Sequence, residues 1–205
     1  MQILYALGIV GLSLLLSMNL PYFYIRAKES VISASKQLEF EKRDVKNSWV
    51  VALICLLPSL LVLIITKNNA VTAITLALGL IAYCDFAIRW IPDCLLYSTV
   101  WLSLVLRAGQ MFDQGIMGAV LFCLPMLIVQ GFSLMTKQKG CFASGDLYLT
   151  PALGVWFMPE IAPALMACVL LISSFVSRFI KEVPLITCIL PVFTGYQICA
   201  KYLYF

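Results

Sequence analysis

The feature that most constrains this chain is its series of apolar runs, nearly free of charged residues and separated by polar connections. The runs cover residues 3–24, 49–66, 70–88, 94–106, 116–135, 147–158, 161–177 and 183–203. A helix needs about 20 apolar residues to cross a bilayer, and a backbone in lipid must satisfy its own hydrogen bonds. The sequence therefore predicts an all-α fold, a polytopic transmembrane helical bundle of about eight spans. Because 94–106 and 147–158 are short, counts of six or seven are the alternatives.

The composition agrees with a membrane protein that forms one unit. The chain is 62% hydrophobic and 12% charged, against about 25% charged residues in soluble domains. The first run ends in aromatic and then basic residues instead of a small-residue cleavage site, which indicates a retained span and not a signal peptide. We expect a single integral-membrane domain over 1–205, with a short basic loop at 25–48 as its one sizeable polar segment. A net charge of +4 gives no indication of nucleic-acid binding.

Lys and Arg residues set the expected orientation, because they concentrate in cytoplasmic loops. With the loop at 25–48 inside and eight spans, eleven of the 14 basic residues fall on the cytoplasmic side. Lys67, Arg107 and Lys201 fall outside, as does the N-terminus. Dropping one span after residue 93 would move several of these charges to the wrong side.

Two absences narrow the chemistry that is available. The chain has no His, which excludes HExxH zinc proteases and Ser-His hydrolases. Its eight Cys form no CxxC pair and nearly all lie in apolar runs, so we expect them to pack as small hydrophobes and to hold no metal. Any reaction must use Asp, Glu, Lys, Cys, Ser or Tyr.

Seven of the ten acidic residues lie in the loop at 25–48 or in short connections, where we expect them to be solvated, and three remain as candidates: Asp85, Asp93 and Asp146. Asp85 is near the cytoplasmic end of the third run, where an ionisable group is costly and therefore a functional candidate. The alternative for Asp85 is an ion pair with Arg89, four residues later on the same helical face. Asp93 follows Pro92 at the start of a run, where helix capping is the favoured interpretation.

Asp146 follows Gly145 and opens the run at 147–158, so on its own it also predicts a helix cap. The topology adds a second interpretation, because Asp85 ends an inward-running span and Asp146 begins an outward-running one. Both carboxylates then reach the same cytoplasmic depth. Two carboxyl groups in an apolar setting cannot both ionise cheaply, so one stays protonated while the other acts as a base. This is the requirement for aspartic proteolysis, and it predicts that the two groups approach to hydrogen-bonding or one-water reach.

Two sequence blocks around these aspartates resemble the type IV prepilin peptidases. These are membrane aspartic peptidases with a first Asp shortly before a Pro-Asp or Pro-Asn pair and a second Asp in a GxGD motif. The first block is CDFAIRWIPD, with Asp85 at the catalytic position and Pro92 and Asp93 as the pair. The second block is ASGDLYLTPALGVW, with Gly145 before the catalytic Asp146.

The second block continues to match beyond the aspartate, with Gly154 and Trp156 at the positions of the family's following Gly and Trp. It departs from the family in two places, where Ala143 replaces the first Gly of GxGD and Tyr148 replaces a common Lys. Longer members carry a domain with two CxxC pairs, and many use S-adenosylmethionine to methylate the new pilin terminus. The loop at 25–48 has no Cys, so the resemblance implies a short, peptidase-only form. Such a form needs no cofactor, and S-adenosylmethionine is expected only if methylation is retained.

The resemblance implies a function: a membrane aspartic endopeptidase that removes the short basic leader of type IV prepilins or prepilin-like proteins. Its expected place is the cytoplasmic face of the bacterial inner membrane, as a multi-pass protein with a periplasmic N-terminus. The expected partners are the lipid bilayer and a prepilin or pseudopilin with a hydrophobic N-terminal segment. Two alternatives stay open: a transporter or assembly subunit that uses the same Asp residues as a proton or cation site, and a catalytically inactive scaffold of the same fold.

Overall fold

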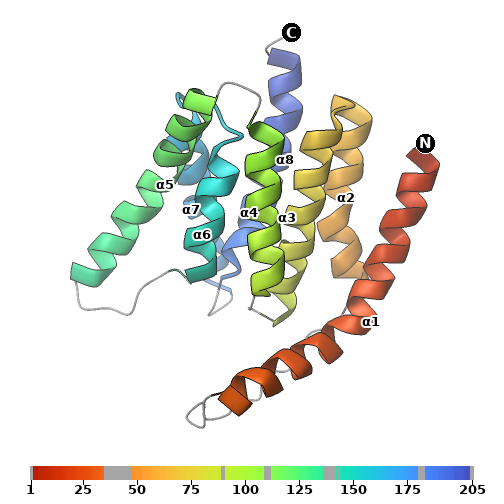
Figure 1. The fold of residues 1–205 in the computed structure, drawn as a ribbon. Coiled ribbons are helices and arrows are strands. Elements are labelled where there is room, and N and C mark those ends of the chain that lie inside the picture. The colour runs from red at the N-terminus through yellow and green to blue at the C-terminus, as the bar shows by residue number, and fades with distance from the viewer. Residues whose placement is uncertain are drawn as a thin grey trace.

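The protein is described here by a computed structural model that covers residues 2–34, 48–88, 91–108, 112–135, 142, 144–179 and 183–203. These residues form an all-helical bundle without strands, which confirms the predicted fold class (Figure 1). The helices are α1 (Gln2–Ala34), α2 (Trp49–Thr66), α3 (Asn69–Ile88), α4 (Asp93–Arg107), α5 (Phe112–Met135), α6 (Ser144–Gly154), α7 (Ala162–Val176) and α8 (Leu185–Leu203). Each predicted apolar run overlaps one of these eight helices.

Helix length separates the bundle into two groups. Four helical segments are long and apolar enough to cross a bilayer, namely residues 6–26 of α1, α2, α3, and residues 113–135 of α5. Helix α7 is apolar but shorter, and α6 has only 11 residues, or about 16 Å of helix. Helices α6 and α7 both pack against the long helix α5.

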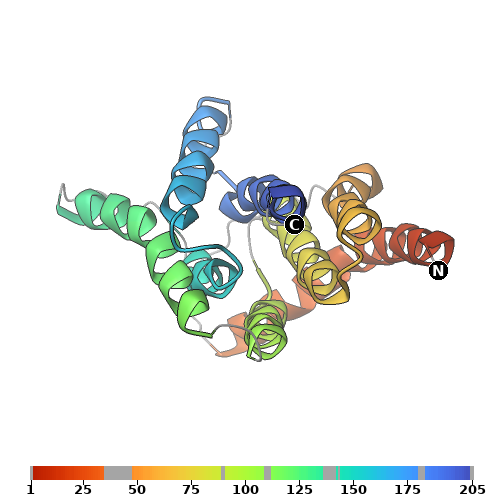
Figure 2. The same ribbon diagram turned by 90° about the horizontal axis from the view of Figure 1, so that it is seen from above.

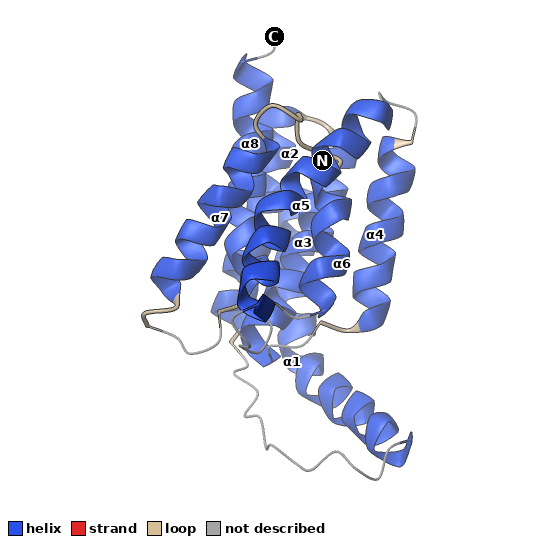
Figure 3. Ribbon diagram, turned by 90° about the vertical axis from the view of Figure 1, so that its left-hand side faces the viewer, coloured by secondary structure: helices blue, strands red, loops and turns tan. Residues whose placement is uncertain are grey.

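Consecutive helices from α2 to α8 run in opposite directions, so helix ends gather at two ends of the bundle (Figures 1 and 3). One end contains the last turn of α3 and the first turns of α4, α6 and α8, and we call it the aspartate end. Helix α3 lies at the centre and packs against α2, α4 and α8, with Ile74, Leu78 and Ile81 fully buried. Seen from above, α5 and α7 extend outward from this centre (Figure 2).

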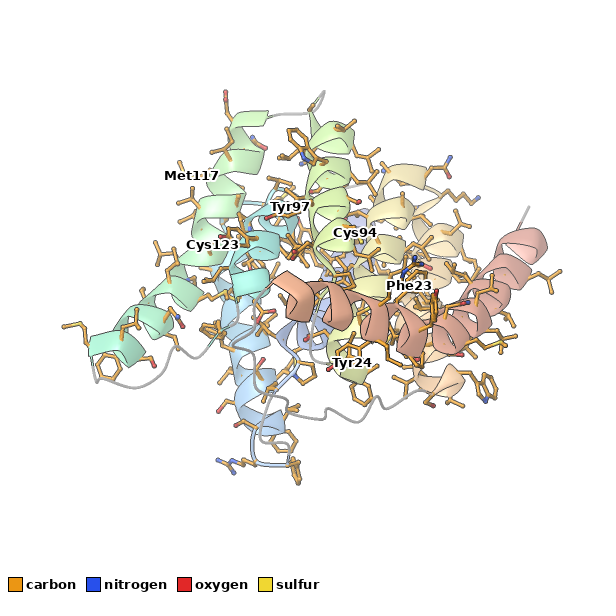
Figure 4. The ribbon with its side chains drawn as sticks, turned by 60° about the horizontal axis from the view of Figure 1, so that its bottom comes forward. Phe23, Tyr24, Cys94, Tyr97, Met117 and Cys123 are labelled. Atoms are coloured by element: carbon orange, nitrogen blue, oxygen red, sulfur yellow. The ribbon has the colours of Figure 1, made fainter. Side chains whose placement is uncertain are left out.

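Helix α1 is longer than the predicted run at 3–24 because it continues to Ala34, into the basic loop. Its first part runs beside α2, and near Pro21 the helix bends and passes beneath the aspartate end (Figures 1 and 4). Proline removes a backbone donor and clashes with the preceding turn, which accounts for the bend. Figure 4 views this end, with Phe23 and Tyr24 on the second part of α1.

Helix α6 is shorter than the predicted run at 147–158, because it ends at Gly154. The backbone N–H groups of Trp156 and Phe157 instead bond the carbonyls three residues earlier, at 3.1 Å each. Pro159 has no N–H, and it disfavours helical geometry at Met158. The resulting turn buries the ring of Phe157 between aromatic side chains of α5 and α8, with its centroid 4.6 Å from Phe122 and 5.6 Å from Phe193.

The contact between α5 and α6 depends on glycine. A Cβ atom built on Gly154 would lie 2.6 Å from the Cα of Ala119, and one on Gly118 would lie 2.8 Å from the Gly154 carbonyl oxygen and closer still to that of Phe157. Small residues at such crossings let helix backbones approach closely within a membrane. The two glycines therefore fix the position of α6 against a long helix.

We predict that Gly118→Ala and Gly154→Ala each lower the free energy of unfolding by about 1 to 3 kcal/mol, since the added methyl group meets backbone atoms that cannot move aside. Gly131→Ala is the matched control on α5, because a Cβ there meets nothing within 4 Å and Ala favours the helix. Unfolding in detergent measures all three. Equal stability of Gly118→Ala and Gly131→Ala would contradict the close α5–α6 contact.

Candidate active site

Asp85 is buried near the C-terminal end of α3, with 8% of its surface exposed. Its Oδ2 atom accepts a hydrogen bond of 3.0 Å from the backbone N–H of Ile186. Ile186 is the second residue of α8, where backbone N–H groups have no partner within their own helix. The carboxylate and the first turn of α8 therefore satisfy one another, at the end of α8 that carries partial positive charge.

A second bond joins the same two helices. The Thr187 hydroxyl donates to the Ala82 carbonyl at 3.0 Å. Ala82 lies three residues before Asp85, and residues at this spacing share a helical face. The first turn of α8 is thus attached to α3 at two adjacent points. The predicted alternative partner of Asp85, Arg89, lies outside the described residues.

Asp146 is buried in the first turn of α6, with 7% of its surface exposed. The helix begins two residues earlier, at Ser144, so Asp146 is inside the first turn and is not the N-cap. The Thr150 hydroxyl donates to the Asp146 carbonyl at 2.6 Å and lies 3.5 Å from the sulfur of Met126 on α5. The Asp146 side chain thus sits near the positive end of its own helix, on a turn that packs against α5.

Gly145 shows what lies on the other side of this turn. A Cβ atom added there would be 3.4 Å from Cδ1 of Leu96 and 3.5 Å from Cδ1 of Ile91, which is ordinary contact. Leu96 is in the first turns of α4, and Ile91 is in the connection that follows α3. The segment that carries Asp146 therefore packs against the connection that leaves the Asp85 helix, and both buried carboxyl groups lie at the aspartate end.

Asp93 is separate from this pair in its environment, because it is exposed. Pro92 occupies the N-cap of α4, and its carbonyl accepts from the N–H groups of Leu95 and Leu96 at 3.0 Å each. Asp93 is the first helical residue, one position further into α4 than a cap. Its carboxylate can still interact favourably with the partial positive charge at the start of α4.

The far end of α6 is held by Trp156, which is 6% exposed. Its indole Nε1–H donates to the Ser103 hydroxyl oxygen at 2.7 Å, and that hydroxyl donates in turn to the Ala152 carbonyl. The guanidinium carbon of Arg107 lies 5.7 Å from the centre of the Trp156 ring. Helix α4 thus fastens the end of α6 opposite Asp146.

Several of these contacts were not predicted from sequence. The residues involved, Ser103, Ile186 and Thr187, all lie in apolar runs. The only sequence signal for their contacts was a polar hydroxyl group, on Ser103 and on Thr187, within an otherwise apolar run. Of the two departures from the GxGD pattern, Ala143 lies outside the described residues, while Tyr148 is exposed. The described residues contain no group of three or more Cys, Asp or Glu side chains placed to hold a metal ion.

Comparison with known protein families finds a match to the part of the chain that contains the two buried aspartates. A sequence model of the type IV leader peptidase family matches residues 71–180, which is more than half of the chain and contains both Asp85 and Asp146. No curated protein and no solved structure matched the chain.

We predict that Ser103→Ala and Trp156→Phe each cost about 1 to 3 kcal/mol of stability, because each leaves a buried polar partner without its bond. The double variant should lose less stability than the sum of the two single losses, since both changes break the same Trp156–Ser103 hydrogen bond. Ser98→Ala is the matched control on α4, where the exposed hydroxyl bonds only within its own helix. Thermal unfolding in detergent gives the double-mutant cycle, and additive losses would contradict the α4–α6 link.

Proposed function

Because this chain belongs to the type IV leader peptidase family, and is thus a membrane peptidase, we propose that it is of the aspartic type, with Asp85 and Asp146 as the catalytic pair. The observation that carries the proposal is that two buried carboxyl groups lie at one end of the bundle, where Gly145 beside Asp146 lies against Ile91, in the connection that follows the Asp85 helix, and against Leu96 of α4. A buried carboxyl group is rare unless it is paired or functional.

The helix ends around the pair favour the single negative charge that this chemistry needs. Asp85 faces the first turn of α8, and Asp146 lies in the first turn of α6. Both turns carry partial positive charge, which offsets part of the cost of an ionised carboxylate in an apolar setting. In the proposed mechanism the two carboxyl groups share one proton, because a second negative charge in an apolar setting is costly.

The proposed reaction uses that shared proton. The ionised carboxylate takes a proton from water as the water oxygen attacks the peptide carbonyl, while the protonated partner gives its proton to the carbonyl oxygen. The tetrahedral intermediate then breaks at the C–N bond. The first carboxyl group returns its proton to the leaving amine, and the second recovers one from the intermediate. Water is consumed, the pair is restored, and no cofactor is required.

For the substrate, we propose a type IV prepilin or a prepilin-like protein of the bacterial inner membrane. The family description supports a leader peptide as the part removed. A substrate with a hydrophobic segment in the bilayer and a basic leader on the cytoplasmic side would present its scissile bond at the depth of the aspartate end. This assignment places the N-terminus of the enzyme on the periplasmic side and the aspartate end at the cytoplasmic face.

We predict that Asp85→Asn and Asp146→Asn each lower leader cleavage at least 100-fold, because loss of an acid or base removes about 10² to 10⁴ in rate. Asp93→Asn should retain most activity, since Asp93 is exposed at the start of α4. Asp113→Asn is the matched control, an exposed carboxylate in the first turn of α5 at the opposite end. Membranes holding each variant are incubated with a prepilin, and cleavage is followed by gel shift and N-terminal sequencing.

Cleavage that survives both Asn substitutions in folded protein would mean that the pair is structural. Absence of cleavage in the wild type, together with proton-coupled flux, would instead support a transport role for the same residues.

A further inference from the structure

The first turn of α8 lies outside the region that matches the family, which ends at residue 180. It nevertheless supplies a hydrogen bond to Asp85, from the backbone N–H of Ile186. The neighbouring Thr187 hydroxyl bonds the Ala82 carbonyl, one helical turn before Asp85. A part of the chain beyond the family region thus contacts Asp85 directly.

We propose that Thr187 is a positioning residue of the active site, whose hydroxyl anchors the first turn of α8 to α3 so that the Ile186 N–H holds the Asp85 carboxylate in place. This inference rests on the proposed function of Asp85. The Thr187 hydroxyl bonds the Ala82 carbonyl, and in this proposal it acts on the carboxylate through the backbone of the residue beside it.

The geometry of the two bonds explains why the hydroxyl matters. Buried side chains already pack α8 against α3, and the two hydrogen bonds add directional restraints to that packing. Two bonds from adjacent residues, each 3.0 Å long, set both the rotation and the height of that turn. A carboxylate is planar, so holding one of its oxygens limits the directions that the whole group can take. Acid/base catalysis needs such a fixed direction, since a misplacement of about 1 Å can cost about 100-fold in rate.

Thr194 shows that this contact is not simply the usual behaviour of Thr in an apolar helix. It lies on the same helix α8, and its hydroxyl donates to the Leu190 carbonyl of that helix at 2.8 Å. Hydroxyl groups in apolar helices commonly make this bond to the preceding turn. The carbonyl groups one turn before Thr187 belong to the residues just ahead of α8, and its hydroxyl instead reaches across to α3.

The test compares Thr187→Val, which keeps the branched shape and removes the hydroxyl, with Thr187→Ser, which keeps the hydroxyl. Thr194→Val is the matched control on α8. Cleavage of a prepilin is measured per folded enzyme, at a temperature well below each unfolding midpoint. We expect Thr187→Val to lower kcat about tenfold or more with KM unchanged, because substrate contacts stay intact while the carboxylate loses its orientation. Thr187→Ser should restore kcat to near the wild-type value, and Thr194→Val should match wild type.

A second measurement addresses the Ile186 N–H itself. Replacing the Leu185–Ile186 amide by an ester, through incorporation of the α-hydroxy analogue of Ile, removes this donor and leaves every side chain in place. The ester should lower kcat as Thr187→Val does, and the two changes together should lose less than the product of the separate effects. This measurement keeps the proposal testable if Thr187→Val fails to fold.

A wild-type kcat in Thr187→Val or in the ester variant would overturn the inference. So would an equal loss in Thr187→Ser, which would show that shape and not the hydroxyl is what matters. Asp85→Asn and Asp146→Asn are assayed in parallel to separate this from failure of the proposed function. Inactive Asn variants beside a fully active Thr187→Val would overturn the positioning role alone, whereas active Asn variants would overturn the aspartic mechanism and this inference with it.

Discussion

The hydrogen bond between the Ile186 N–H and the Asp85 carboxylate joins two requirements of an apolar fold. A helix that starts among apolar groups leaves backbone N–H groups without partners, and a carboxylate buried there needs donors. Each would be costly alone, and together they satisfy one another. Helix α3 is the most central helix, so this contact also fixes where the last helix of the chain begins. The candidate chemistry and the packing of α8 therefore depend on the same pair of atoms.

The short helix α6 shows how the second carboxyl group is kept in place without a spanning helix of its own. Gly118 and Gly154 bring α6 against α5, while Trp156 and Ser103 attach its far end to α4. The first turn of α6, which carries Asp146, then has little freedom to move, because α6 is held by both α5 and α4. Gly154 and Trp156 thus set the position of α6, and with it that of Asp146, the proposed reacting residue.

The sequence predicted the helices well, because hydrophobic runs in a membrane protein translate almost directly into helices. It also predicted that Asp85 and Asp146 share one end, since that follows from alternating helix direction. The helix ends were less predictable: α6 already ends at Gly154, and Pro92, not Asp93, occupies the N-cap of α4. The contacts of Ile186 and Ser103 were not predictable, since each joins residues far apart along the chain, 101 and 53 positions respectively. Apolar periodicity carries no information on which backbone donor meets which side chain.

The position of the pair at the end of the bundle also has a physical reason. At mid-depth, helical backbone groups are already paired with one another, so a carboxylate there would find no spare donor. Within a turn of the helix ends, α6 and α8 both offer unpaired N–H groups and partial positive charge. In the proposed reaction, a position at the end of the bundle brings the pair close to the water that hydrolysis consumes and leaves the polar leader of the proposed substrate outside the apolar core. The helix ends thus supply the donors and the partial positive charge that the proposed pair, one carboxyl group ionised and one protonated, requires.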